Sequence, residues 1–315
     1  MDLFIYTLKR IGTALLTLLL VAAITFFLMN AIPGSPFMTD KSTPEQIALA
    51  NAKYGLDKPL VVQFVNYIKN LLHGDMGTSL KMQQDTAVAK ILFGQGKFGR
   101  SIRLGVFALL TAIIVGIPLG CLCAYYRGKW IDSILRVVTT VGIAMPTFVI
   151  ATLMLFTFGV NLKILPVQSG TLDTPISYVM PVITMALYPS CHIAKLTRTS
   201  MLDSISQDYI RTARAKGLKT KMILFKHALR NSLIPVITYL GPLTASIITG
   251  SLVVEQIYSI PGIGSYFVSS ILNRDYPIIM GTTILLAALI VFMNLVVDIA
   301  YKIVDPRINL TKKGD

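Results

Sequence analysis

The residues that could carry chemistry in this chain are few and scattered. Gly94, Gly96 and Gly99 have the G-x-G-x-x-G spacing with which dinucleotide-binding folds hold a pyrophosphate at a helix N-terminus. That mechanism needs a preceding strand, whereas here a long apolar run follows within a few residues. A flexible hinge is therefore the better interpretation. Phe98 stands where a P-loop needs Ser or Thr, so we find no recognisable site for hydrolysing ATP.

Histidines, cysteines and isolated carboxylates give no reaction centre either. The histidines are far apart, and no nucleophile–base pair is visible. The cysteines fall inside apolar runs, where Cys usually packs as a small apolar side chain, although a soft-metal C-x-C site stays open as an alternative. Two carboxylates near the ends of runs are functional candidates, or interfacial groups that contact water or an arginine. The residues are His73, His192, His227, Cys121, Cys123, Cys191, Glu255 and Asp298.

The apolar runs determine the class of protein. Hydrophobic residues make up 54% of the 315 residues and charged residues 14%, whereas a soluble domain has about a quarter charged residues. Six uncharged runs reach the length of about 20 residues that a helix needs to cross a bilayer. Because backbone groups in lipid must be paired within their segment, we expect an all-α integral membrane protein with six transmembrane helices. The runs are Ile11–Ala31, Leu104–Tyr126, Val137–Leu162, Thr174–Ala194, Asn231–Val254 and Tyr276–Val297.

The chain has a net charge of +14, and its basic residues are distributed unevenly among the loops between the runs. Basic residues gather in both termini and in the loops after the second and fourth runs, whereas the two short opposite loops contain only Lys163 and Arg274. A loop as long as the segment after the first run is translocated across the membrane largely regardless of its charge, so its basic residues do not decide the orientation. We therefore predict that both termini are cytoplasmic and that the charge reports topology in a lipid membrane. Nucleic acid is a poor competitor, because the basic loop lacks stacking aromatics.

Two segments between the runs are predicted to be helical. In the long external segment, Thr43–Ala52 begins with helix-start signals and Val61–Leu72 carries an apolar stripe that would cover the outer ends of the spans or meet a partner. In the loop after the fourth run, Ser204 and Gln207 have capping-box spacing, and Gly217 is suited to end the helix that follows. By composition alone, this loop could also lie on the membrane surface.

This loop closely resembles the cytoplasmic "EAA" loop of permease subunits of bacterial binding-protein-dependent ABC importers, in its peptide-importer form. The general pattern has Glu where Arg211 stands, which favours the di/oligopeptide and nickel branch. The long segment after the first span is typical of the first-named permease of a pair, the oligopeptide permease B type. The matching segments are Asp208–Gly217, His227–Pro235, Tyr54–Pro59, Gly74–Ser79, Glu255–Gly264, Arg274–Pro277 and Asp305–Arg307.

The resemblance implies a type I ABC importer transmembrane fold and an order of segments along the chain. These are a cytoplasmic N-terminus and first span at 1–31, a helical extracellular segment at 32–100, a transmembrane core at 101–302 with the coupling loop at 195–233, and a cytoplasmic tail at 303–315.

The resemblance also implies a function in the bacterial plasma membrane. The chain would be a permease subunit of an ATP-driven importer of oligopeptides or dipeptides, paired with a homologous second permease and supplied by an extracellular peptide-binding lipoprotein. Two cytoplasmic ATPase subunits would bind ATP and Mg, so this chain would be no enzyme and hold no cofactor. The loop would form a coupling helix in a groove of the ATPase, with Ala213 and Gly217 as close-contact positions and Tyr209, Arg211 and Arg214 flanking them.

Three alternatives remain at this point. Within the family, the cargo could be nickel or a metal chelate. A channel or secondary transporter outside the family could also have six spans, but it would not need the glycine-terminated loop helix. A membrane-embedded enzyme would show convergent acid, base or metal-binding residues at one depth, and the sequence shows none.

Overall fold

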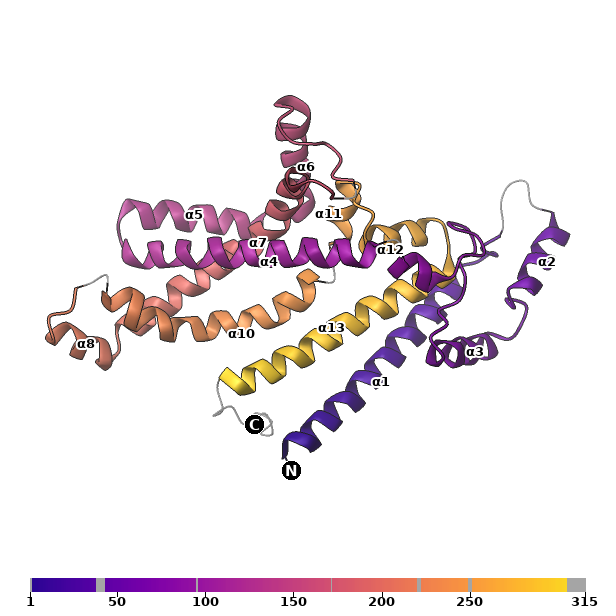
Figure 1. Ribbon diagram of the computed structural model, residues 1–315, viewed down its shortest axis with the longest axis horizontal. Helices are drawn as coiled ribbons and strands as arrows, with labels where there is room; N and C mark the ends of the chain where they lie inside the picture. The colour runs from indigo at the N-terminus through magenta and orange to yellow at the C-terminus, as the bar shows by residue number, and fades with distance from the viewer. Residues whose placement is uncertain are drawn as a thin grey trace. The chain divides into compact units, whose positions relative to one another are not determined.

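The computed structural model describes residues 2–37, 43–94, 96–170, 172–219, 222–248 and 251–304. Within these ranges the chain forms helices and connecting turns, with an isolated bridge between Thr78 and Ala87 and no β-strand (Figure 1). The predicted all-α class is thereby confirmed. A helix pairs its backbone groups within the segment, as a hydrocarbon surrounding requires.

The helices group into two compact units. The first is formed mainly by Met1–Gly99 and Pro261–Leu295, and the second mainly by Arg100–Ile260. This grouping follows packing and not membrane topology. The division at residues 31, 100 and 302 therefore stays a prediction.

Four helices are each long and apolar enough to cross a membrane. They cover the first, second, fourth and sixth predicted runs except for the terminal residues Tyr126 and Thr174, and these runs are thus confirmed as long apolar helices. Proline inside α4 and α7 does not break them. The four helices are α1 (Asp2–Ala31), α4 (Lys97–Tyr125), α7 (Pro175–Ile205) and α13 (Tyr276–Val304).

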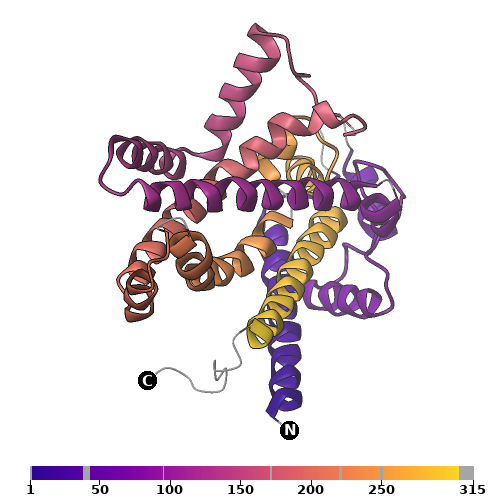
Figure 2. The same cartoon turned by 60° about the vertical axis from the view of Figure 1, so that its left-hand side comes forward.

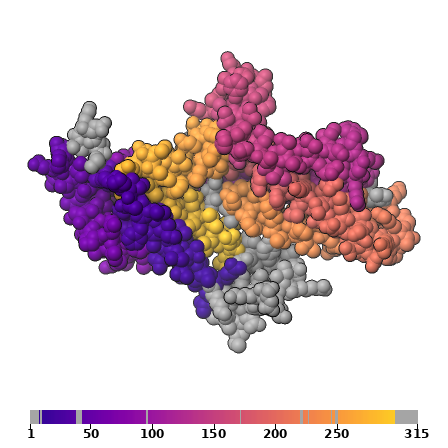
Figure 3. All heavy atoms as spheres, turned by 180° about the vertical axis from the view of Figure 1, so that it is seen from behind, coloured from indigo at the N-terminus to yellow at the C-terminus, as the bar shows by residue number. Residues whose placement is uncertain are grey.

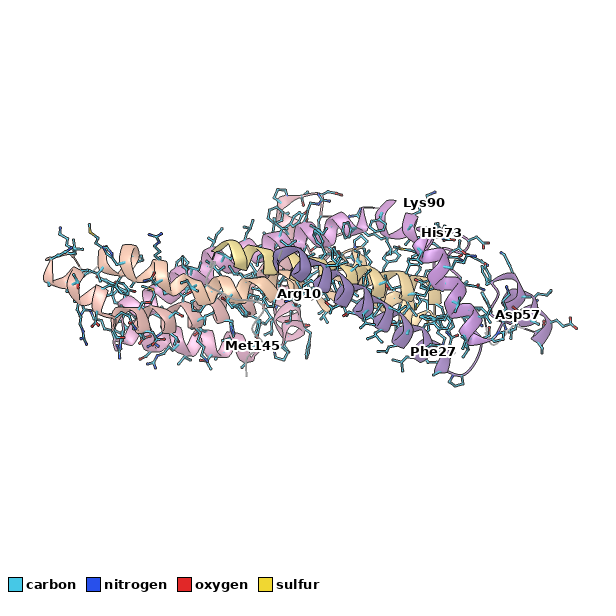
Figure 4. All side chains as sticks on the ribbon, turned by 90° about the horizontal axis from the view of Figure 1, so that it is seen from below. Arg10, Phe27, Asp57, His73, Lys90 and Met145 are labelled. Atoms are coloured by element: carbon cyan, nitrogen blue, oxygen red, sulfur yellow. The ribbon has the colours of Figure 1, made fainter. Side chains whose placement is uncertain are left out.

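The third run, for which the sequence predicts a span over Val137–Leu162 with a kink or a helix–helix contact at Pro146, is a sharply bent pair of helices. The helices on either side of the break meet at 104°, and the second of them projects from its unit (Figures 1 and 3). Met145, labelled in Figure 4, is extended at φ −77° and ψ 126°, because the ring of Pro146 disfavours helical backbone at the preceding residue. The segments are α5 (Trp130–Ala144), α6 (Thr147–Met154) and the π-helix η2 (Leu155–Asn161).

The fifth run, predicted as one span over Asn231–Val254, is also divided. It begins as α10 (Leu229–Ile248) and ends in the short α11 (Leu252–Ile257). Ser251 is extended, and its hydroxyl accepts a hydrogen bond from the Val254 N–H at 3.2 Å. A side-chain cap of this kind starts a new helix. Within the residues that the structure describes, α10 is not among the helices that are long and apolar enough to cross alone.

In the second unit, α4, α7 and α10 share one apolar core and run alongside one another (Figures 1 and 2). Gly116 and Gly120 of α4 face the backbone of α7. A Cβ atom at Gly116 would lie 2.7 Å from the Ser190 carbonyl oxygen, and one at Gly120 would lie 2.5 Å from the Ala194 carbonyl oxygen. Small residues spaced by four allow membrane helices to approach this closely. The glycine pair therefore sets the distance between α4 and α7.

In the first unit, both helices predicted for the segment after α1 are present. α2 (Pro44–Lys53) starts with a full capping box, in which the Thr43 hydroxyl and the Gln46 side chain each accept the other residue's N–H. α3 (Leu60–Leu72) packs on α1 through Phe64, whose ring lies 5.4 Å from that of Phe26 and 5.6 Å from that of Phe27. Figure 4 labels Phe27 on α1. The apolar stripe of α3 thus covers the end of a membrane helix, one of the predicted roles.

An exposed polar contact fixes the end of α2 to the loop that follows α3. The Tyr54 hydroxyl donates to Asp85 at 2.7 Å, and the Lys53 ammonium lies 3.1 Å from the same carboxylate. The Tyr54 hydroxyl and then Lys53 lower the pKa of the Asp85 carboxyl. Because the pKa is lowered in the folded state, this contribution to stability is present at neutral pH and is lost as the pH falls through the lowered value.

A buried carboxylate joins two of the segments that carry the family resemblance. Asp275, which is fully buried directly before α13, accepts a hydrogen bond from the Ser79 hydroxyl at 2.6 Å. It also accepts three backbone N–H groups, those of Leu80, Lys81 and Met82, at 3.1, 3.0 and 2.9 Å. The Gly74–Ser79 and Arg274–Pro277 segments are therefore two halves of one contact.

Replacing Asp275 with Asn should destabilise the first unit. The substitution removes the charge from four hydrogen bonds, and a single hydrogen bond to a charged group contributes about 1.5–3 kcal/mol. We expect the melting temperature of the purified chain in detergent to fall by several degrees. Asp57→Asn, at an exposed position, is the matched control and should not change it. An unchanged melting temperature for Asp275→Asn would contradict the proposed contribution of this contact.

Candidate functional site

The predicted loop helix is present as α8 (Asp208–Ala215), but it begins differently from the prediction. α7 continues through Ser204 to Ile205, so Ser204 is helical and cannot act as an N-cap. The predicted capping box of Ser204 and Gln207 is therefore wrong. Gln207 itself is the extended N-cap residue and makes no side-chain capping bond. Asp208 lies in the first turn, where a negative charge is favourable.

α8 ends as the sequence predicts. Gly217 has φ +74°, its N–H donates to the Arg214 carbonyl at 2.9 Å, and the Leu218 N–H donates to the Ala213 carbonyl at 3.4 Å. This pair of bonds is the Schellman arrangement, which needs a left-handed residue after the helix. A Cβ atom at Gly217 would meet nothing within 4 Å. The glycine is required by the backbone conformation and not by crowding within the chain.

One side of α8 packs on its own chain. Ile210 and Ala213 are buried against Ile223 and Ala228, which belong to the π-helix η3 (Ile223–Ala228) before α10. The short side chain of Ala213 lets the two helices lie close together. Of the five predicted coupling residues, Ala213 is thus the one whose side chain faces the interior of this chain.

The other side of α8 is open. Tyr209 is 39% exposed, and Arg211, Arg214 and Gly217 are exposed with it. The ion pair between Arg211 and Asp208, at 3.2 Å, joins two exposed groups and contributes little to stability. These four exposed residues, two of them basic, lie around the part of α8 and of its left-handed end that the chain leaves uncovered, and we call them together the α8 surface.

The C-terminal extension of α7 holds the α8 surface. The predicted span in α7 ends at Ala194, but the helix continues for eleven further residues to Ile205. At 1.5 Å per residue this extension is about 16 Å long. α8 is therefore held beyond the apolar part of α7.

A buried ion pair that the sequence did not reveal fixes α7 against α5. The Arg198 guanidinium donates to both carboxylate oxygens of Asp132, at 2.8 and 2.9 Å, and the Gly128 N–H donates to the same carboxylate at 3.2 Å. The Asp132 side chain is 1% exposed. An aspartate in the first turn of an apolar helix is a signal for such a pair, but its partner lies 66 positions away.

The remaining candidates divide among structural roles. Glu255 is fully buried and accepts a hydrogen bond from the Ser101 hydroxyl at 2.7 Å, whereas the side chain of Asp298 lies outside the described residues. Gly96 is left-handed at φ +67° directly before α4, and the π-helix η1 (Lys90–Gly94) precedes it in place of a strand. The strand that the dinucleotide interpretation needs is therefore not there, and the flexible hinge stays a prediction, with Gln95 outside the described residues.

The structure gives no support to a metal centre. All three cysteines are buried and unbonded to one another. Among the residues whose positions are described, no three His, Cys, Asp or Glu side chains are close enough to share an ion.

Comparison with known families identifies the chain's relatives. Residues 116–310 match the family described as "Binding-protein-dependent transport system inner membrane component", and residues 3–89 match the corresponding N-terminal family. The chain belongs to this family. It is therefore a multi-pass membrane protein of a transport system. The alternatives outside the family, a channel, a secondary transporter or a membrane-embedded enzyme, are no longer needed.

Individual relatives of this inner membrane component match over nearly their whole length. The dipeptide transport system permease protein DppB of Bacillus subtilis is 44% identical, covering 98% of this chain and 99% of the relative. The oligopeptide transport system permease protein OppB of Haemophilus influenzae is 40% identical, covering 95% and 97%. Inward-facing structures of the MetNI methionine ABC transporter share the fold, with a TM-score of 0.54 at 16% identity over 66% of this chain and 94% of the other.

Removing one partner of the Asp132–Arg198 pair should destabilise the second unit. An uncompensated buried charge costs about 3–5 kcal/mol, so Asp132→Leu should lower the melting temperature in detergent. The Asp132→Leu, Arg198→Leu double variant should recover part of the loss. Arg136→Leu is the control, since Arg136 is 54% exposed and 3.6 Å from Asp132. Additive effects of the two single substitutions would contradict direct pairing.

Proposed function

We propose that this chain is the permease subunit of an ATP-driven importer of dipeptides or oligopeptides. The relatives that match it over nearly the whole chain are named dipeptide and oligopeptide transport permeases, and this does not favour nickel as the cargo. An extracellular solute-binding lipoprotein delivers the peptide. A homologous second permease completes the passage through the bacterial plasma membrane.

In this proposal the α8 surface is the contact with a cytoplasmic ATPase subunit. The observation that carries it is the division of α8 into two sides. Ile210 and Ala213 hold the helix on its own chain, while Tyr209, Arg211, Arg214 and Gly217 are open to a partner. Ala213 thus acts as the small residue that seats α8, and the other four contact the ATPase.

The proposed mechanism is mechanical. Two ATPase subunits bind ATP and Mg and close on each other, and their closure displaces α8. Because α7 is continuous from Pro175 to Ile205, a displacement of α8 is carried into the membrane core. The core then alternates between inward- and outward-open states, a switch between two discrete packings. The chain itself holds no cofactor and does no covalent chemistry, and both of its termini are cytoplasmic.

Two substitutions at Gly217 separate docking from backbone strain. Gly217→Ala and Gly217→Trp both place a Cβ atom in the left-handed region, at a cost of about 1–2 kcal/mol. A Cβ atom at this position would meet nothing within 4 Å in the chain, so we attribute any further loss caused by the indole to a docked partner. We expect Gly217→Ala to keep part of the peptide uptake and Gly217→Trp to abolish it. Both variants should insert and assemble with the second permease.

The measurement is uptake of labelled di-, tetra- and hexapeptides by the complete importer, together with peptide-stimulated ATP hydrolysis. Equal uptake by the two variants would count against the α8 surface as the ATPase contact. It would favour the alternative in which the loop lies on lipid phosphates. Accumulation of nickel in place of peptide by the unsubstituted importer would overturn the proposed cargo.

A further inference from the structure

α7 carries polar side chains along a side that the chain leaves open. Tyr188, His192 and Lys195 follow one another at intervals of four and three residues, which places them on one side of a helix. Tyr188 is 41% exposed, His192 is half-buried and Lys195 is exposed. Residues on the opposite side of the helix, such as Ala186 and Ile193, are buried in the chain.

An aromatic side chain from α10 extends this row. The ring of Tyr239 stacks on the imidazole of His192, with centroids 4.3 Å apart and planes at 26°. The ring of Tyr188 lies 6.2 Å from the same imidazole, on the adjacent turn of α7. Three rings from two helices therefore form a continuous ladder.

A cavity of about 380 Å³ lies at the Tyr188 end of the ladder. Tyr188 contributes to its wall, together with Thr147 of α6, Ser246 of α10 and Ser251 before α11. The wall is completed by apolar residues of the same helices. Four segments of the second unit thus meet around a hollow with hydroxyl groups on its surface.

Other exposed helix faces are different in kind. The open side of α1 presents leucine, isoleucine and phenylalanine over most of its length, and that of α5 presents Val137, Val138 and Val141. Such faces are suited to lipid. An imidazole in a membrane helix is costly in hydrocarbon, and it normally faces a water-filled cavity or a partner, whereas Lys195 lies just beyond the predicted end of the span at Ala194. The polar row therefore marks the side of α7 and α10 that faces away from lipid.

We infer that Tyr188, His192 and Tyr239 line this subunit's wall of the translocation pathway and contact the peptide in transit. The inference rests on the proposed function. Peptides of different sequence share planar amides with N–H and C=O groups. Aromatic rings offer a flat apolar face and a polar edge, which suits a wall that must accept many side chains. The ladder is thus a sequence-tolerant contact surface.

Cysteine accessibility in the complete importer tests this placement. In a chain whose three buried cysteines are replaced by Ala, we introduce His192→Cys, Tyr239→Cys and, as a lipid-facing control, Val138→Cys. A charged methanethiosulfonate reagent reacts with the thiolate, which forms in water and not in hydrocarbon. We expect labelling at 192 and 239 to be at least about tenfold faster than at 138, and saturating peptide to slow it.

The outcomes separate this inference from the proposed function. Labelling at 192 and 239 no faster than at 138, in an importer that takes up peptide normally, would overturn the inference and leave the function standing. Fast labelling that peptide does not slow would likewise overturn the assigned contact. An importer that fails to take up any peptide, with fast labelling at 192 and 239, would overturn the function while the water-lined face stands.

A kinetic readout distinguishes contact from packing. Tyr239→Leu should raise the KM for peptide uptake several-fold, whereas Tyr239→Phe, which keeps the ring, should change it little. An equal rise in KM for both variants would contradict the stacking role. Unchanged KM in both would contradict peptide contact.

Discussion

A backbone amide in hydrocarbon has no water to bond, so each membrane segment must pair its own polar groups. The chain meets this constraint with long helices, and also where those helices stop. At the bend after α5, Pro146 has no N–H to satisfy, and its carbonyl accepts the N–H groups of Val149 and Ile150 at 3.0 and 3.3 Å. Before α11, Ser251 accepts the Val254 N–H with its hydroxyl and the Glu255 N–H, at 2.9 Å, with its carbonyl. These bonds pair backbone N–H groups of the helix that follows each sharp turn.

The same constraint governs the buried carboxylates, because an unpaired charge in a low-dielectric interior is costly. Asp132 receives a bidentate guanidinium, Asp275 receives a hydroxyl and three amides, and Glu255 receives the Ser101 hydroxyl. Each contact joins segments that are distant in sequence. These directional contacts fix the register of neighbouring segments, which apolar side-chain packing alone would determine less specifically. Asp132 in particular fixes α7, whose C-terminal extension holds the α8 surface.

Local signals in the sequence predicted local structure well. The helix start near Thr43, the left-handed Gly217 at the end of α8 and the absence of a nucleotide-binding strand from the described residues before Gly96 follow from backbone preferences of single residues and their near neighbours. The same reasoning failed at Ser204, since α7 continues through that residue. At Pro146 it predicted a kink or a helix–helix contact without deciding between them, because a proline inside an apolar run can be accommodated, as in α4, or can turn the chain by 104°. Which of these happens depends on what packs around it.

The sequence by itself determined the all-helical membrane class, the order of the apolar segments and the place of the loop helix, because length, hydropathy and glycine conformation act locally. Only the tertiary structure decided that Arg198 pairs with Asp132, that Ser79 binds Asp275 and that Ala213 faces inward while Tyr209 faces outward. It also brought His192 and Tyr239 into one ladder. These choices depend on which helix faces meet, and a close approach such as that of Gly120 to α7 involves partners far along the chain that no local preference specifies.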